Sequence, residues 1–207
     1  MSTGTDVSQI TQAATAPPSV RPQRSDARRN RERVIAAARK CMARDGLDVQ
    51  MDEIARRAKV GVGTVYRHFP TKDDLVEALA GERFVRLAEL ADEALEHEDP
   101  WEGFVQFMRA SGEIQVADKA LSEVLVSRPE VMRGAAESVD MLGRVTKVVE
   151  RAQESGALRA DAQPEDVPMV MCALAGACNN PMSDPERYIG IVIDGMRAPG
   201  TTPLQPR

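Results

Sequence analysis

The chain has 207 residues, of which 43% are hydrophobic and 3% aromatic, and its formal net charge is −5. This length and apolar content suffice for a sizeable core without disulfides, and the scarcity of aromatic residues argues against a sheet sandwich and for packed helices. The three cysteines, Cys41, Cys172 and Cys178, form an odd set within apolar helical patterns. They are therefore predicted to be small core residues in a reducing compartment, which excludes a disulfide framework.

The charge is divided along the chain. Residues 21–72 contain 14 Lys and Arg against six Asp and Glu, whereas residues from 73 onward contain 13 against 25. A basic segment joined to an acidic body suits a protein that presents one end to a polyanion.

No apolar run approaches the roughly 20 residues that span a bilayer, and the N-terminus is polar, without the basic region and apolar core of an export signal. The sequence therefore predicts a cytoplasmic protein that does not interact with membranes.

Apolar periodicity and capping residues predict about nine helices and no strand. Residues 1–24, rich in Ser, Thr, Gln and Pro, are predicted to be a disordered tail. Ser25 is a plausible cap for a first helix that Gly46 ends. Two short helices follow at residues 51–58 and 62–69, separated by a turn of about three residues that contains Gly61.

Thr71 is predicted to cap a long helix over residues 71–97, and the rest of the chain reads as a helical body. Its predicted helical segments are an aromatic stretch from Trp101 to Met108, residues 119–126, 129–155, 164–177 and 184–197. Gly156 closes the third of these, and Asn179, Asn180 and Pro181 stop the fourth. A Pro-rich tail, residues 199–207, follows the last helix.

The stretch AKVGVGTVYRHFP, residues 58–70, contains a G-x-G pair and admits two interpretations. A dinucleotide fingerprint would need a third glycine at Tyr66 and a strand before Gly61, and a phosphate loop would need a following Gly-Lys-Ser/Thr. Neither condition is met. The alternative is the second helix of a helix-turn-helix, which enters the DNA major groove.

A helical wheel supports this alternative. At 100° per residue, one face is apolar and carries Val62, Val65, Tyr66 and Phe69. The opposite face carries small or hydrogen-bonding side chains: Gly63, Thr64, Arg67 and His68. Such a face allows close approach to DNA and offers donors to base edges and phosphates.

The stretch ARKCMARDGLDVQMDEIARRAKVGVGTVYRHFPTKDDLVEAL resembles the DNA-binding domain of the TetR family of bacterial transcriptional regulators. The elements DEIA, GVGTVY and HFPTKDDL occur in order, and the resemblance covers about residues 25–85. It implies an all-α protein with an N-terminal three-helix helix-turn-helix DNA-binding domain, residues 25–72. A C-terminal helical ligand-binding and dimerisation domain, residues 73–198, is linked to it by helix 71–97.

The resemblance also implies roles for single residues. Thr64 and Arg67 would read bases, Tyr66, His68 and Lys72 would hold phosphates, and Gly63 would give clearance in the groove. Arg67 is the favoured base reader, because a bidentate contact with guanine is the commonest specific pairing. Solvated surface positions remain the alternative for Arg67 and His68, and Tyr66 combines a core ring with a hydroxyl that reaches a phosphate.

One position departs from the family. Where the family usually has Thr or Ser before the second helix, this chain has Gln50, which is a poor cap but can still donate to a phosphate. Arg28 and Arg29 in the first helix, and Arg21 and Arg24 before it, are candidates for further phosphate or minor-groove contacts. Solvated charge is the favoured alternative for these four.

In the body, the resemblance implies a dimer formed by the last two helices and a ligand held among the preceding ones. Two apolar stripes fit such an interface: Val167, Val170, Met171 and Leu174, and Ile189, Val192, Ile193 and Met196. The alternative is that these stripes pack within one chain. Candidate pocket residues are Trp101, Phe104, Phe107, Met108, Met132, Met141 and Leu142. For the pocket candidates, ordinary core packing is the favoured alternative.

Nothing in the sequence supports catalysis, a metal or another cofactor. His68 and His97 lie on separate predicted helices, and neither has a Cys or acidic partner at a metal-binding spacing. The function predicted is a homodimeric repressor that binds a palindromic double-stranded DNA operator and is released by a small-molecule effector. The alternatives are a helical dimeric interaction protein without DNA binding, and an activator without small-molecule input.

Overall fold

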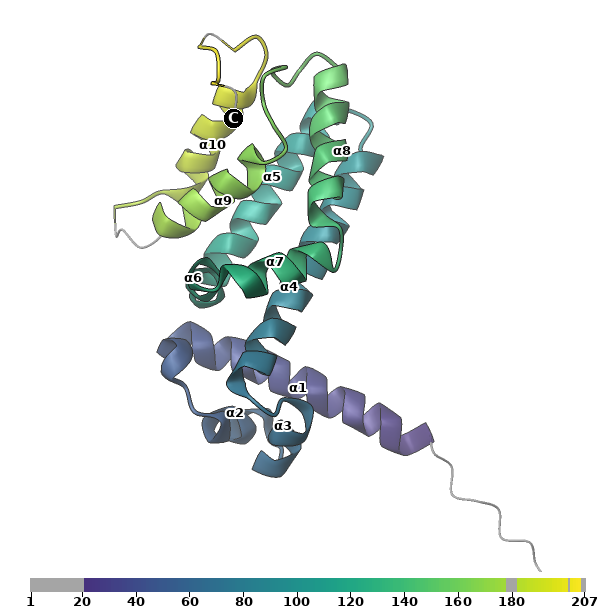
Figure 1. Cartoon of the computed structure of the whole chain (residues 1–207), viewed down its shortest axis with the longest axis vertical. Coiled ribbons are helices and arrows are strands. Elements are labelled where there is room, and N and C mark those ends of the chain that lie inside the picture. Colours follow the sequence, from purple (N-terminus) through teal and green to yellow (C-terminus); the bar gives the residue numbers. More distant parts are fainter. Residues whose placement is uncertain (1–20, 178–181, 201, 206–207) are drawn as a thin grey trace, which may run out of the picture.

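The computed structural model describes residues 21–177, 182–200 and 202–205. These residues form an elongated all-α molecule with a small N-terminal bundle at one end and a larger helical body at the other (Figure 1). The described residues contain no strand beyond one isolated bridge between Leu158 and Arg197. The predicted all-α class is therefore confirmed. None of the described helices combines the length and apolar content that a bilayer crossing requires.

The N-terminal bundle consists of α1 (Arg21–Asp45), the 3-10 turn η1 (Gly46–Asp48), α2 (Met51–Ala58) and α3 (Val62–His68). Helix α1 begins four residues before Ser25, so it includes the last residues of the predicted tail, while residues 1–20 lie outside the described chain. Gly46 has a φ of 66°, the left-handed conformation that ends α1, as the sequence predicts.

The core of this bundle is made by apolar residues that recur every three or four positions. Buried side chains include Val34, Ile35 and Met42 of α1 and Ile54 of α2, together with Val65, Phe69, Leu75 and Leu79. Leu121 and Leu125, which belong to the body, are buried in the same core. The bundle is thus packed directly against one end of the body.

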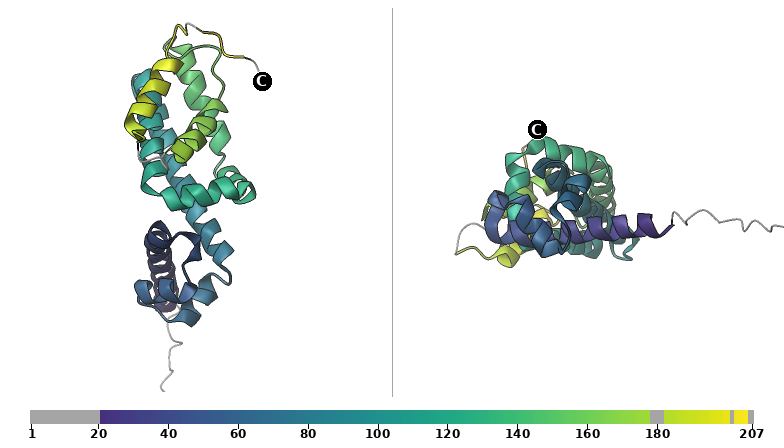
Figure 2. Two further views of the ribbon diagram at one scale, coloured as in Figure 1. Left: turned by 90° about the vertical axis from the view of Figure 1, so that its left-hand side faces the viewer. Right: turned by 90° about the horizontal axis from the view of Figure 1, so that it is seen from below.

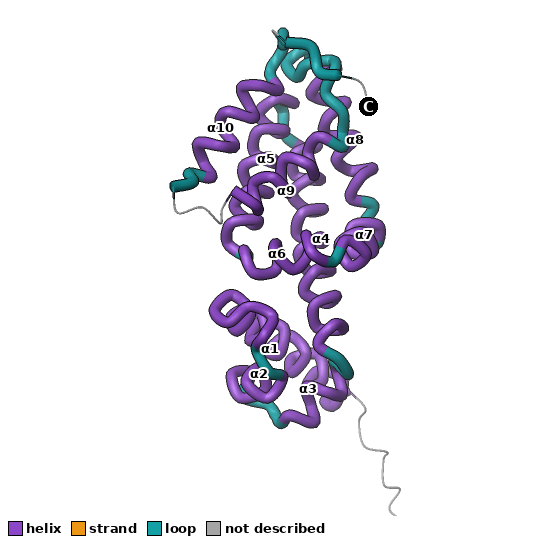
Figure 3. The backbone as a smooth tube through the Cα atoms, turned by 60° about the vertical axis from the view of Figure 1, so that its left-hand side comes forward, coloured by secondary structure: helices purple, strands orange, loops and turns teal. Residues whose placement is uncertain are grey.

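Helix α4 (Lys72–Glu96) joins the two parts. The Thr71 hydroxyl accepts a hydrogen bond from the Asp74 amide at 3.1 Å, and the Asp74 carboxylate accepts one from the Thr71 amide at 2.8 Å. This capping box confirms Thr71 as the cap. The first turns of α4 lie in the bundle core through Leu75 and Leu79, and its last turns lie in the body core through Leu90 (Figure 3).

Six further helices form the body: α5 (Pro100–Ala117), α6 (Lys119–Ser127), α7 (Pro129–Glu137), α8 (Met141–Glu154), α9 (Asp166–Ala177) and α10 (Pro185–Met196). Helices α4, α5 and α8 run roughly lengthwise (Figure 1). Helices α6 and α7 cross the end of the body that faces α1, and α9 and α10 pack on α5 (Figure 2).

Two predicted segments differ from the structure. The single helix predicted over residues 129–155 is two helices, because Asp140 adopts a φ of 49° and the chain turns there. A short polar side chain makes aspartate one of the few residues that tolerate this left-handed conformation. Helix α5 continues to Ala117, well beyond the predicted aromatic stretch. The predicted stop at residues 179–181 lies outside the described residues, as do positions 201 and 206–207 of the predicted C-terminal tail.

The two described cysteines differ in burial. Cys41 is fully buried, as predicted, and burial raises the pKa of its thiol. Cys172 is exposed on α9, so its predicted place in the core is wrong. Cys178 lies outside the described residues.

Candidate nucleic-acid interface and internal cavity

The turn between α2 and α3 is formed without a glycine in a left-handed conformation. Lys59, the C-cap of α2, has φ 55° and donates its backbone N–H to the carbonyls of Ala55 and Arg56. Gly61 is the N-cap of α3 with φ −66°, a value open to any residue. The Arg33 guanidinium of α1 donates to the Lys59 carbonyl at 2.8 Å and so fixes the turn against the first helix.

Helix α3 buries a narrower face than the wheel predicts. Val65 and Phe69 are 0% and 2% exposed, but Val62 and Tyr66 are 39% and 46% exposed. The predicted core position of the Tyr66 ring is therefore wrong, because seven residues make only two turns and the bundle covers only the centre of the apolar side. The exposure leaves the Tyr66 ring and hydroxyl available to a partner.

The remaining face of α3 is open to solvent. Gly63 and Arg67 are exposed, while Thr64 and His68 are half-buried. A Cβ added at Gly63 would meet no atom within 4 Å, so nothing inside the protein requires glycine there. The Arg67 side chain has no hydrogen bond or ion pair within the described part of the chain.

Many other arginines of the bundle are held by acids. Arg56 pairs with Glu53 at 2.5 Å, and Arg44 pairs with Asp45 at 2.5 Å. The Arg56 guanidinium, by hydrogen bonding, lowers the pKa of the Glu53 carboxyl. Arg28 and Arg29, candidate phosphate contacts, also have acidic partners on α1, Glu32 and Asp26. Arg67 differs from these residues in having no competing partner.

Lys72 and Gln50 flank this face, and both use part of their hydrogen-bonding capacity internally. The Lys72 ammonium donates to the Leu47 carbonyl at 2.6 Å, which ties α4 to the turn after α1. The Gln50 side-chain amide donates to the Asp48 carbonyl at 2.9 Å and makes no capping bond to α2, although Gln50 is the N-cap residue. Each retains at least one further donor.

A cavity of about 350 Å³ that opens to solvent lies among the helices of the body, and we call it the α4–α9 cavity after the helices that line it. Of the candidate pocket residues, Phe107, Met132, Met141 and Leu142 line it. Trp101, Phe104 and Met108 do not. They are buried in the core, where Trp101 stacks on Phe104 at 5.7 Å, because α5 turns these three side chains away from the cavity.

One end of the α4–α9 cavity is polar. The buried Arg83 guanidinium of α4 donates to the Ser122 hydroxyl of α6 at 2.9 Å. The Ser122 hydroxyl lies 3.0 Å from the Gln115 carbonyl, and the Gln115 side chain donates to the Met171 carbonyl at 3.0 Å. These contacts join α4, α5, α6 and α9 around the cavity. The Ser111 hydroxyl, also buried in the wall, has no hydrogen-bond partner among the described residues.

Burial shifts the pKa values of two groups at the polar end of the cavity, Arg83 and Asp118. Loss of solvent lowers the pKa of Arg83, and the nearby Asp118 carboxylate only partly offsets it. Loss of solvent also raises the pKa of Asp118, against the attraction of Arg39 and Arg83. The Arg39 guanidinium of α1 lies 3.5 Å from the Asp118 carboxylate and 3.0 Å from that of Glu82. These ion pairs link the bundle to the body beside the cavity.

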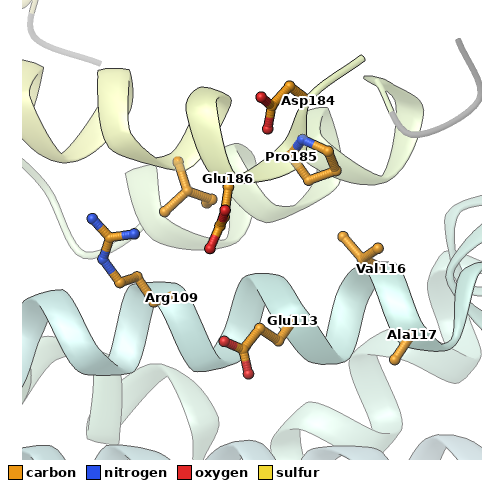
Figure 4. Close-up of a pocket in the computed structure, with 8 residues that line it drawn as sticks. Arg109, Glu113, Val116, Ala117, Asp184, Pro185 and Glu186 are labelled. Atoms are coloured by element: carbon orange, nitrogen blue, oxygen red, sulfur yellow. The ribbon is translucent and has the colours of Figure 1, made fainter. Parts of the chain in front are cut away.

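A second hollow, of about 430 Å³, lies between α5 and the start of α10. Figure 4 shows Arg109 and Glu113 on α5, facing Asp184 and Glu186 on the other side. All four of these polar side chains are exposed, so the hollow is a solvated groove without a buried polar group that would hold a ligand. Among the described residues, no cluster of three or more His, Cys, Asp or Glu side chains is placed to bind a metal.

The apolar stripes predicted for a dimer interface belong largely to the protomer core. Leu174, Ile189, Ile193 and Met196 are buried in the core of the body, because these faces of α9 and α10 pack against α5 and its neighbours. Val167 is buried as well, whereas Val170, Met171 and Val192 are partly buried, and Met171 lines the cavity.

The outer faces of α9 and α10 present a different set of residues. Met169 and Ile191 are 53% and 63% exposed. Between and beside them lie exposed small residues: Ala173, Gly176 and Gly195. Exposed apolar and small side chains on neighbouring helices allow close contact with another helix pair. The sequence pattern did not indicate this face because its glycines and alanines add little apolar character.

Two sequence profiles of known families match the chain. Residues 34–79 match the profile described as bacterial regulatory proteins of the tetR family, and residues 99–198 match that of an SbtR-like transcriptional regulator C-terminal domain. The first match covers most of the N-terminal bundle and the start of α4. The second covers the body from α5 to the end of α10.

Individual relatives extend the likeness over the whole fold. The crystal structure of the TetR transcription regulatory protein from Mycobacterium vanbaalenii is 38% identical and has a TM-score of 0.64, over 86% of this chain and 100% of that one. RolR, solved in complex with resorcinol, is 20% identical with a TM-score of 0.56, over 84% of this chain and 90% of RolR, and so shares the fold.

Curated relatives are similar over a shorter segment. An HTH-type transcriptional regulator of Staphylococcus aureus is 42% identical over 53 residues, or 25% of this chain. The match spans only 29% of that regulator's length. The proteins from M. vanbaalenii and S. aureus are both described as regulators of transcription, and the likeness to the solved structures includes both the bundle and the body.

Proposed function

The chain belongs to the TetR family of bacterial transcriptional regulators, and from this membership we propose that it is a cytoplasmic repressor. Its homodimer binds a palindromic operator and leaves it when a small molecule fills the α4–α9 cavity. The ligand response rests above all on helix α6, which belongs both to the cavity wall and to the core of the DNA-binding bundle.

DNA recognition is supported by the open face of α3. In this proposal Arg67 and Thr64 contact base edges, and the exposed Tyr66 hydroxyl and His68 contact phosphates. A helix fits a major groove about 12 Å wide, and Gly63 allows its backbone to approach closely. Lys72 and Gln50 add phosphate contacts with the donors that they do not use internally.

Operator binding requires two copies of α3 at the correct separation, about 34–36 Å. We propose that the outer faces of α9 and α10, with Met169, Ala173, Gly176 and Ile191, form the contact between the two protomers. These faces are exposed and contain mainly apolar and small residues, so two copies can pack as a four-helix interface.

The coupling between cavity and DNA passes through α6 and α4. Leu125 both lines the cavity and packs in the bundle core, and Leu121 of the same helix packs there too. Arg83 lines the cavity from α4, whose first turns carry the bundle. A ligand that prefers another position of α6 or α4 therefore moves the bundle and changes the separation of the two α3 helices.

RolR shows that a protein of this fold accommodates a small organic molecule, resorcinol. For the present chain, the support for a ligand is the cavity itself. Its volume of about 350 Å³ is near the lower limit of pockets that bind small molecules, about 300–1,000 Å³.

Selection of genomic fragments by the full-length protein tests the proposal. We expect enrichment of a palindromic site in front of a small number of genes, with binding that weakens as salt is raised. Failure to retain any duplex would favour the alternative, a helical interaction protein. Binding that raises transcription in a reconstituted assay, with no response to ligands, would favour an activator.

A further inference from the structure

We propose that the effector is a small amphipathic monocarboxylate, with its carboxylate at Arg83 and Ser111 and its apolar part along the apolar end of the α4–α9 cavity. The inference rests on the proposed function in that it takes this cavity as the effector site, and it adds the chemical class of the effector. The observations that carry it are the charge of the wall, an unpartnered hydroxyl, and the division of the wall into polar and apolar ends.

The wall of the cavity is cationic although the body is acidic. Two arginines, Arg83 and Arg133, line it, and no Asp or Glu among the described residues does. Arg133 is exposed and lies on α7, whereas Arg83 is only 7% exposed. A cavity with this lining repels cations and favours an anion.

Arg83 is a buried cation that has no acidic partner among the described residues. Within the described chain it forms no ion pair, and its hydrogen bond to the Ser122 hydroxyl uses one of five N–H donors. Burying an unpaired charge is costly, so buried arginines are normally paired with a carboxylate or phosphate. The nearest acid that affects its ionisation, Asp118, forms its ion pair with Arg39. The remaining donors of Arg83 are therefore available to a ligand.

Ser111 provides a second polar group. Its hydroxyl is buried and has no hydrogen-bond partner among the described residues, a rare condition for a buried polar atom. Ser111 lies one helical turn from Gln115 on α5, and the Gln115 carbonyl accepts from the same Ser122 hydroxyl that binds Arg83. Ser111 and Arg83 thus line the same end of the cavity and can both donate to one carboxylate.

The opposite end of the cavity is apolar. Phe107, one turn before Ser111 on α5, and Leu87, one turn after Arg83 on α4, lie on this side. Met141 and Val145 of α8 continue the wall. From Ser111, where the carboxylate binds in this proposal, to Phe107 the helix rises about 6 Å, at about 1.5 Å per residue. The ligand should therefore have an apolar part of at least this length, such as a phenylalkyl group or a medium alkyl chain.

A monocarboxylate fits better than other anions. Arginine binds carboxylates and phosphates bidentately, but a phosphate monoester carries nearly two charges and needs more donors to leave water. Only one buried cation and few further donors are available here. Methionine and aliphatic side chains along the rest of the wall suit a flexible apolar group.

Calorimetric titration of the full-length dimer, without DNA, tests the inference. The probes are 3-phenylpropionate and octanoate, each with its uncharged amide of the same carbon skeleton. Wild-type protein should bind a carboxylate about tenfold to a hundredfold more tightly than the matched amide, the range of a charged hydrogen-bonded contact. The variant R83M should lose this preference, and R83K should retain part of it.

Two further variants keep the test decisive. S111A removes a hydroxyl that has no internal partner, so it should fold normally and bind the carboxylate several-fold more weakly. R86M removes an exposed arginine from the next turn of α4 and should bind as wild type does. If R83M does not fold, a several-fold smaller preference for the carboxylate in S111A, with the full preference retained in R86M, supports the inference.

The outcomes separate this inference from the proposed function. Equal or tighter binding of both amides, or no binding of either carboxylate at millimolar concentration, overturns the monocarboxylate class. An amide that binds and releases DNA would overturn it while leaving the ligand-responsive repressor in place. Carboxylate binding that depends on Arg83 but leaves DNA affinity unchanged would support the class and contradict release by this ligand.

Discussion

Arg67 on α3 and Arg83 on α4 both lack an acidic partner within the described chain, but the first is exposed and the second is buried. Arg67 projects from the DNA-binding bundle into solvent, whereas Arg83 is buried and lines the cavity in the body. In our account each leaves its charge available to an anion that the protein itself does not supply. The outer arginine meets the polyanionic DNA, and the inner one meets a small carboxylate.

Other arginines show that the lack of a partner is not general. Arg56, Arg86 and Arg159 each pair with an acid in their own vicinity, at 2.5, 3.1 and 2.6 Å. The exposed pairs of Arg56 and Arg86 contribute little stability, but they reduce the positive field that these two residues present. Lack of an acidic partner does not by itself distinguish Arg67 and Arg83, since exposed Arg57 of the bundle also has no ion pair among the described residues. What distinguishes them is their position, on the open face of α3 and in the cavity wall.

The largest expected effect is on dimerisation, and it comes from a substitution on the outer faces of α9 and α10. Ile191→Asp places a charge at the centre of the proposed interface twice in each dimer, because the contact is symmetric. Each unpaired buried charge costs several kcal/mol, so the dissociation constant of the dimer should rise about a thousandfold or more. Sedimentation equilibrium measures it. Val85→Asp, at an apolar position of α4 with 48% exposure, is the control and should remain dimeric. An unchanged dimer in Ile191→Asp would place the interface elsewhere.

The next largest effect is the loss of operator affinity when Arg67 is substituted. Arg67→Ala should weaken binding to the selected operator about a hundredfold, because each dimer loses two contacts of about 1–3 kcal/mol. Fluorescence anisotropy at fixed salt measures the affinity. Arg86→Ala on α4 removes the same charge from an ion-paired position and should bind normally. Equal affinity of Arg67→Ala and wild type would exclude Arg67 as a base reader.

A smaller effect is expected at Gly63, where folding and DNA binding should respond in opposite directions. Nothing in the protein lies within 4 Å of an added Cβ, so Gly63→Ala should stabilise α3 by about 0.5–1 kcal/mol. The same methyl group would stand between the helix and the DNA and should weaken operator binding about tenfold. Gly81→Ala, equally open on α4, is the control. Tight operator binding by Gly63→Ala would show that α3 does not approach the groove on this side.

The smallest expected effect is a gain in stability at the inner arginine. Arg83→Met replaces an unpaired buried cation by an apolar side chain, and Ser122 keeps its contacts with the carbonyls of Gln115 and Asp118. The free protein should become about 1 kcal/mol more stable, or roughly 2–4 °C in Tm. Differential scanning calorimetry without ligand measures this. A fall in Tm would show that Arg83 stabilises the body and is not held in reserve for an anion.

Much of the fold could be predicted from the sequence because its signals are local. Thr71, Gly46 and the apolar repeat of α1 set helix boundaries within a few residues, and α2 was predicted over its observed range. The break at Asp140 could not be predicted, because a left-handed aspartate depends on how α7 and α8 pack rather than on a recognised helix-stopping residue.

The candidate sites could be predicted only in part, because local sequence signals fix the order of residues on a helix but not how the helices pack. The order of residues on α3 follows from helix geometry, but the exposure of Tyr66 depends on how much of α3 the bundle covers. The apolar stripe with Ile189 and Ile193 is buried within the protomer, whereas the family resemblance implies a place in the dimer contact. Periodicity alone does not distinguish an intramolecular from an intermolecular partner. No sequence pattern singles out Arg83, because its burial in the cavity wall depends on how α4 packs against the other helices of the body.

The central claim is that a carboxylate bound at Arg83 in the cavity lowers the affinity of the protein for its operator, which Arg67 contacts. Operator affinity measured across a titration of the tighter-binding carboxylate tests it, with wild type, R83M and R86M compared at one salt concentration. We predict that the operator Kd rises with carboxylate and then levels off in wild type and R86M, while it stays constant in R83M. An operator Kd that is independent of carboxylate in wild type, or that rises equally in R83M, would contradict the account.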